Sequence, residues 1–122
     1  MIETPLQAGF RNLGGCLMSL KAISKSNEKH KGHWLSPKYK AYEETIAILT
    51  RSAFGSKRYS KGWIQIQCYF KTKTHCDLNN IPKSLFDGMK KGGVLLDDKN
   101  FSVTVAPAIY CDRDSIEVCL WV

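Results

Sequence analysis

The segment that most constrains the fold is WIQIQCYF, at residues 63–70, because apolar and polar side chains alternate along it. Successive side chains of a β-strand point to opposite faces of the sheet, so this pattern predicts a strand with one buried face. The buried face would hold Ile64, Ile66, Cys68 and Phe70. Residues 16–23, 101–106 and 115–122 have weaker strand patterns. We therefore expect a sheet of about four strands.

Two segments have the three-and-four spacing of apolar residues that is typical of an amphipathic helix. The first begins at Ser36-Pro37, a serine cap followed by a proline in the first helical position, and ends at Gly55. Its expected buried stripe consists of Tyr39, Tyr42, Ile46, Leu49 and Ala53. The second helix is expected over residues 81–91, with Asn79-Asn80 as its cap and Gly92-Gly93 as its end.

The elements follow one another in the order β-α-β-α-β-β, which predicts an α+β fold with a mixed sheet and two helices. A chain of 122 residues has room for one such domain. We expect residues 16–122 to form it and residues 1–15 to be an irregular N-terminal arm. Residues 24–35 are polar and basic, which predicts a loop of the length often used for binding.

The charge is distributed unevenly along the chain. Residues 1–75 carry 13 Lys and Arg against 4 Glu, a net of +9, whereas residues 76–122 carry 5 against 7 acids, a net of −2. One interpretation is an ordinary solvated basic surface. The other is a basic surface that binds a polyanion beside a local acidic site. Nucleic acid is favoured over a membrane surface, because the basic residues do not form one face of a single helix.

The five cysteines are Cys16, Cys68, Cys76, Cys111 and Cys119, and no two of them form a C-x-x-C pair. This spacing argues against zinc ribbons and thioredoxin-like sites and favours reduced thiols. The chain has neither a secretion signal pattern nor an apolar run long enough to span a membrane, so we expect a cytoplasmic protein and no membrane partner.

The candidate site lies in the segment HCDLNNIPKSLFDGMKKGGVLLDD, at residues 75–98. Asp77 and Asn79 follow the predicted strand, and Lys83 lies one turn into the second helix. Asp97-Asp98 follows a short apolar run that we expect to bring it back alongside Asp77. Oxygen ligands from two segments with a nearby lysine are typical of a site for Mg²⁺, or Mn²⁺ as a substitute, acting on a phosphate.

The same residues have a purely structural interpretation. Asp77 and Asn79 can cap a helix, and Lys83 can be a solvated side chain. Asp97-Asp98 can belong to a polar turn between strands. Spacing alone leaves both interpretations open, because a single D-x-N followed at a distance by D-D is a weak pattern.

The segment resembles the signature of the RusA family of Holliday-junction resolvases. That signature has D-x-D-N, a lysine three residues after the asparagine, then F-D-x-L/M, a glycine and L-D-D. The matching residues here are Asp77, Asn80, Lys83, Phe86-Asp87, Gly93 and Leu96-Asp97-Asp98. The similarity continues more thinly upstream, through Ser26-Asn27 and Leu35-Ser36, so that it covers residues 17–120.

The resemblance implies a homodimeric, Mg²⁺-dependent endonuclease that binds four-way DNA junctions and cuts two strands symmetrically, as in DNA recombination and repair. It implies that Asp77 and Asp98 bind metal, with Asp97 adjacent, and that Lys83 acts near the scissile phosphate. Asp87 and Asn80 are expected to support these residues. The resemblance also implies that basic residues before the segment 75–98 bind DNA phosphates. The expected DNA-binding residues are Lys25, Asn27, Lys29, Lys31, Lys71 and Lys73.

One residue departs from the signature, because Asn79 stands where the family has the second acid of D-x-D-N. As a catalytic and metal-binding residue, Asn79 still offers a carbonyl oxygen to a metal, but it brings no negative charge. Three explanations are open: a naturally slow or inactive protein, compensation by Asp97, or a variant disabled in order to trap DNA. The alternative function is therefore a module that binds branched nucleic acid without cutting it. A basic RNA-associated protein is a third possibility.

Overall fold

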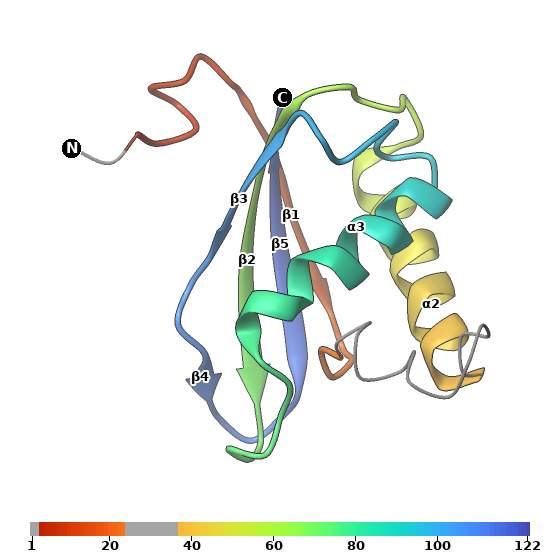
Figure 1. Cartoon of the computed structure of the whole chain (residues 1–122), viewed down its shortest axis with the longest axis vertical. Helices are drawn as coiled ribbons and strands as arrows, with labels where there is room; N and C mark the ends of the chain where they lie inside the picture. Colours follow the sequence, from red (N-terminus) through yellow and green to blue (C-terminus); the bar gives the residue numbers. More distant parts are fainter. Residues whose placement is uncertain (1–2, 24–36) are drawn as a thin grey trace.

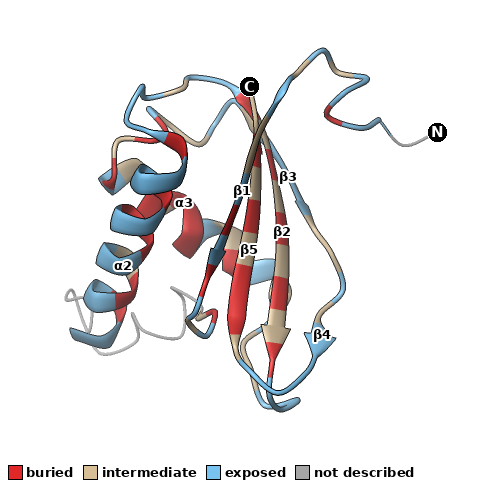
Figure 2. Ribbon diagram, turned by 180° about the vertical axis from the view of Figure 1, so that it is seen from behind, coloured by how far each residue is buried: buried red, intermediate tan, exposed pale blue. Residues whose placement is uncertain are grey.

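A computed structural model describes residues 3–23 and 37–122. The chain forms a sheet with two helices on one of its faces (Figures 1 and 2). The elements in chain order are β1 (Asn12–Met18), α2 (Pro37–Phe54), β2 (Gly62–Phe70), the short 3₁₀ helix η1 (Leu78–Asn80), α3 (Ile81–Lys91), β3 (Phe101–Val105), β4 (Ile109–Tyr110) and β5 (Ser115–Trp121).

The sheet has five strands in the order β1-β5-β2-β3, with the two-residue β4 also paired to β2. Strand β5 is antiparallel to β1 and β2, whereas β3 and β4 run parallel to β2. The predicted α+β class and mixed sheet are therefore confirmed. The predicted number of strands was one too low, because β4 is too short to produce a pattern of alternating residues.

Strand β1 begins earlier than expected. We predicted a strand at residues 16–23 after an irregular arm, but β1 runs from Asn12 to Met18 and pairs with β5 along that length. Gly14-Gly15 belong to the predicted irregular arm, but in the structure both residues pair within the sheet. Gly14 has a φ of +113°, which only glycine adopts easily, and the register of the pairing shifts there. Residues 19–23 lie outside any strand.

The buried face of β2 is the one that the alternation predicted. Ile64, Ile66, Cys68 and Phe70 are at most 2% exposed and belong to the core under the two helices. Figure 2 shows the alternation of buried and intermediate residues along this strand. The opposite face of the sheet carries half-buried side chains, including Trp63 and Trp121.

Helix α3 has the predicted bounds, but Asn80 at its N-cap makes no side-chain capping bond. The buried stripe of α2 also differs from the prediction. Leu49 is 36% exposed, and Ala53 is exposed too, whereas Thr50 and Phe54 are buried. Steps that alternate between three and four average 3.5 residues per turn, whereas the helix has 3.6, so the buried stripe drifts towards later positions along α2. Ser36 and the loop predicted at 24–35 lie outside the described residues. Within the described ranges, neither helix is long and apolar enough to cross a membrane.

Helices α2 and α3 approach each other closely at two glycines, Gly88 of α3 and Gly92, which caps its C-terminus. A Cβ on Gly88 would lie 2.6 Å from Ile46 Cγ2, and a Cβ on Gly92 would lie 2.5 Å from the carbonyl oxygen of Ala47. The second contact is with backbone, which cannot rotate away. Gly92 therefore sets the distance between the two helices, and through it the position of the residues that follow α3.

Gly92→Ala is expected to lower the free energy of unfolding by about 1–3 kcal/mol, because the added methyl forces the helices apart. Urea unfolding followed by circular dichroism measures the change. Gly15→Ala is the matched control, since its Cβ would make only ordinary contacts, with Cys119 Sγ at 3.6 Å and the carbonyl oxygen of Val118 at 3.7 Å. Equal stability of Gly92→Ala and the wild-type chain would show that this glycine is not needed for the close approach of the two helices.

Candidate functional site

Asp77 lies in an exposed position between the end of β2 and the start of α3. Its side-chain Oδ1 accepts the backbone N–H of Asn79 at 3.0 Å, so Asp77 is the N-cap of η1. Asp77 thus has the helix-capping role that the sequence allowed. The carboxylate can still bind a metal, because it has two oxygens and about four lone pairs, and the cap uses only one of them.

Three further predicted residues lie at the same end of α3. Asn79 and Asn80 are exposed in η1, and Lys83 is exposed in the first turn of the helix. Asp77 and Asn79 would share one face only if the strand continued as far as residue 79, but β2 ends at Phe70 and the two residues belong to a turn. The turn places an acid, an amide and a lysine together at a solvent-exposed helix start.

Asp97 and Asp98 lie at the other end of α3, in the turn that leads to β3. The backbone N–H of Lys99 donates to Asp97 Oδ1 at 3.3 Å, and this bond, with a further one from Asp98, lowers the pKa of Asp97 below its ordinary value. Asp97 is therefore ionised at neutral pH. The amide of Phe101 donates to the carbonyl of Asp98 at 3.2 Å, which ties the turn to the start of β3.

Asp87 and Lys90 connect this acidic turn to the two helices. The Lys90 ammonium lies 3.7 Å from Asp98 Oδ1 and 3.7 Å from Asp87 Oδ1. The hydroxyl of Tyr39, which is buried in α2, donates to Asp87 Oδ2 at 3.3 Å. Burial and the nearby Asp87 carboxylate raise the pKa of Tyr39, so the hydroxyl keeps its proton and remains a donor. Asp87 thus lies where a supporting residue for Asp98 is expected.

The two acidic groups do not meet within one chain. Asp77 precedes α3, while Asp98 pairs with Lys90 in its last turn, and a helix of 11 residues is about 16 Å long. Figure 1 shows the segments before and after α3 at opposite ends of that helix. The expectation that residues 94–96 bring Asp97-Asp98 back alongside Asp77 is therefore wrong for a single chain. In the described ranges, no three acidic, histidine or cysteine side chains gather closely enough to hold a metal. The predicted ligands of one chain thus do not fit a complete Mg²⁺ site.

Comparison with known proteins tests whether the resemblance to the RusA signature extends over the whole chain. A family model described as Endodeoxyribonuclease RusA matches residues 20–120, which include both helices and both acidic groups. The chain belongs to the RusA endodeoxyribonuclease family. Among curated proteins, no sequence matches it. RusA proteins are nucleases that resolve Holliday junctions, so the family function is DNA cleavage at branched structures.

A RusA protein needs cations that bind DNA phosphates, and two of the predicted ones precede Asp77 in the chain. Lys71 and Lys73 are exposed in the segment that joins β2 to Asp77, so two of the predicted phosphate contacts lie on the acid's own segment. The other four, Lys25, Asn27, Lys29 and Lys31, lie outside the described residues. The sequence pattern missed Lys21, whose ammonium donates to the carbonyl of Thr74 at 3.1 Å. Lys21 is far from this segment in sequence, and only the fold brings the two together.

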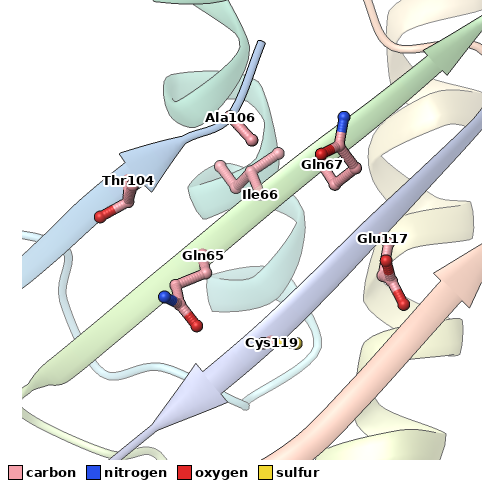
Figure 3. A pocket seen from close by; sticks show the side chains of 7 residues that line it. All are labelled: Gln65, Ile66, Gln67, Thr104, Ala106, Glu117 and Cys119. Atoms are coloured by element: carbon pink, nitrogen blue, oxygen red, sulfur yellow. The ribbon is translucent and has the colours of Figure 1, made fainter. Parts of the chain in front are cut away.

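A hollow of about 140 Å³ lies elsewhere, on the sheet face away from the helices (Figure 3). Its lining residues are Gln65, Ile66, Gln67, Thr104, Ala106, Glu117 and Cys119. The only charged side chain among them is Glu117, so the hollow offers neither a set of metal ligands nor cations for phosphates. It contains none of the predicted site residues of this RusA protein.

Proposed function

We propose that this RusA-family protein binds four-way DNA junctions and resolves them by paired, Mg²⁺-dependent phosphodiester hydrolysis. The observation that carries the proposal is the grouping of Asp77, Asn79 and Lys83 at the exposed start of α3, with Lys71 and Lys73 exposed on the segment that leads to Asp77. Mg²⁺, or Mn²⁺ in its place, would supply activation of water and charge stabilisation at the phosphate. We propose that the protein acts in the cytoplasm, where its DNA substrate lies.

The residues of this chain have distinct roles in that proposal. Lys83 offsets negative charge on the scissile phosphate, because a cation next to the reacting group stabilises the charge that develops there. Lys71 and Lys73 bind phosphates on either side and supply affinity without reading sequence. Asp87 and Lys90 hold Asp98 in the turn before β3.

A homodimer would reunite the two acidic groups. The separation of Asp77 from Asp97-Asp98 along α3 supports an arrangement in which each active site uses Asp77 of one copy and Asp97-Asp98 of the other. A two-fold axis forms two such sites at once, because every contact is repeated with the copies exchanged. Two sites in fixed relation suit symmetric cutting of two strands.

Junction binding is expected to be selective for four-way over linear DNA and to weaken steeply with salt. Each phosphate contact contributes about −0.9 to the slope of log K against log salt concentration. Lys71→Ala and Lys73→Ala should each make the slope shallower by that amount in gel-shift titrations. Arg51→Ala, which removes an exposed cation from the last turn of α2, is the matched control and should leave the slope unchanged.

The second candidate function is a binding module that recognises branched nucleic acid without cutting it. Asn79 favours it, because a neutral ligand in place of an acid weakens any site for a hard divalent cation. Both candidates predict selective junction binding, so binding alone does not separate them. Equal affinity for duplex RNA and junction DNA would contradict both and favour an RNA-associated protein.

A further inference from the structure

His75, two residues before Asp77, makes one ring-stacking contact and two hydrogen bonds. Its ring stacks on Phe70 at the end of β2, with centroids 3.9 Å apart and planes 5° from parallel. Its Nδ1 lies 2.8 Å from the carbonyl oxygen of Cys76, and its Nε2 lies 2.8 Å from the hydroxyl of Tyr110. A carbonyl can only accept, so Nδ1 carries the proton. In the neutral ring, Nε2 is therefore the acceptor and the Tyr110 hydroxyl is the donor.

The carbonyl that His75 holds belongs to the peptide bond between Cys76 and Asp77. Because a peptide unit is planar, fixing its carbonyl also fixes the direction in which the chain enters Asp77. The rest of this connection contains no helix or strand, since residues 71–77 join β2 to η1 as bends and irregular backbone. Freezing such a segment costs conformational entropy, which specific contacts must offset.

Tyr110 is well placed to anchor this arrangement. It lies in β4, which pairs in register with β2 through Phe70, so its backbone is fixed to the sheet. Its side chain is 48% exposed, and its hydroxyl meets the histidine at the protein surface. Removing that oxygen therefore leaves no cavity in the core. Nothing in the family signature or in the sequence spacing pairs residue 110 with residue 75.

We propose that Tyr110, acting through His75, is a positioning residue that holds the peptide entering Asp77 in its active orientation. The catalytic consequence rests on the proposed nuclease function, whereas the mechanical consequence does not. Tyr110→Phe removes only the hydroxyl. Tyr69→Phe is the matched control, because it removes a tyrosine hydroxyl bound to Glu117 at 3.3 Å from the neighbouring position on β2.

Amide hydrogen exchange tests the mechanical part. Tyr110→Phe should speed exchange of amides in residues 71–80, including the Asn79 amide that Asp77 caps, by about fivefold, the equivalent of one hydrogen bond. Tyr69→Phe should leave these amides unchanged, and both variants should lower the melting temperature by a similar few degrees, as expected for the loss of one hydrogen bond. Unchanged exchange in Tyr110→Phe would overturn the proposal. Equal acceleration in both variants would also overturn it, because the effect would then be general loosening of the sheet.

Junction cleavage tests the catalytic part. The substitutions are made in the wild-type chain if it cuts junctions, and otherwise in Asn79→Asp. Tyr110→Phe should lower the rate at saturating junction about five- to tenfold and leave junction affinity in Ca²⁺ within about twofold. Combined with His75→Phe, it should add no further loss, because Tyr110 acts through the histidine. Loss of affinity with an unchanged rate would contradict positioning and make Tyr110 a DNA contact. If neither chain cuts, the nuclease proposal fails, and the exchange result alone decides whether Tyr110 positions Asp77.

Discussion

Asn79→Asp is expected to raise the rate of junction cleavage in Mg²⁺ by about 10- to 100-fold, the range typical of altered groups around metal sites. The substitution returns a negative charge to the position where the RusA signature has an acid. Asn79 is exposed in η1, and its backbone N–H, not its side chain, makes the bond to Asp77, so the turn should survive the change. Single-turnover nicking of a four-way junction measures the gain.

Asn80→Asp is the matched control for this experiment. It places the same charge one residue further along η1, at a position where the RusA signature itself has an asparagine, so no gain in rate is expected there. A gain in both variants would mean that added negative charge helps anywhere in the turn. Selective binding with no cleavage in Asn79→Asp would refute the nuclease proposal for this chain and favour the non-cutting module.

A mixture of Asp77→Asn and Asp98→Asn copies is expected to cut junctions, although each variant alone should lose about 10²- to 10³-fold in rate. If each active site uses Asp77 of one copy and Asp98 of the other, a mixed dimer carries both substitutions in one site and none in the other. After subunit exchange, half of the dimers are mixed, so about a quarter of all sites are intact. Single nicks in a junction labelled on one strand report the recovery.

Asp77→Asn mixed with Lys83→Met provides the control, because both residues lie at the same end of α3 and no mixed dimer contains an intact site. Native mass spectrometry confirms that mixed dimers form in each case. Mixed dimers of Asp77→Asn and Asp98→Asn that remain inactive would show that each site lies within a single copy. The acidic turn before β3 would then have to move towards Asp77 when DNA binds.

Local patterns in the sequence predicted the parts of this fold that local physics determines. The two-residue alternation over 63–70 identified β2, and the glycines after Lys91 marked the end of α3. The patterns failed where pairing with a distant segment overrides local preference. Gly14 enters β1 because β5 pairs with it, and Ile109–Tyr110 form a strand only because the end of β2 lies beside them.

The sequence likewise predicts part of the candidate site, namely which residues belong to it, but not where they lie in space. The types of residue at Asp77, Lys83 and Asp98 are visible in the sequence, because their spacing matches a family signature. Their distribution in space is not, since it depends on the direction in which α3 crosses the sheet. The contact of Lys21 with residue 74, and that of Tyr110 with His75, link segments far apart in the chain. No spacing rule could have found these two contacts.

The most direct test of the central claim is cleavage of a synthetic four-way junction beside a linear duplex of the same sequence, with and without Mg²⁺. The account predicts paired, symmetric nicks that appear only in the junction and only with the metal, slowly in the wild-type chain and faster in Asn79→Asp. Junctions left intact by both chains, or equal cutting of junction and linear duplex, would contradict it.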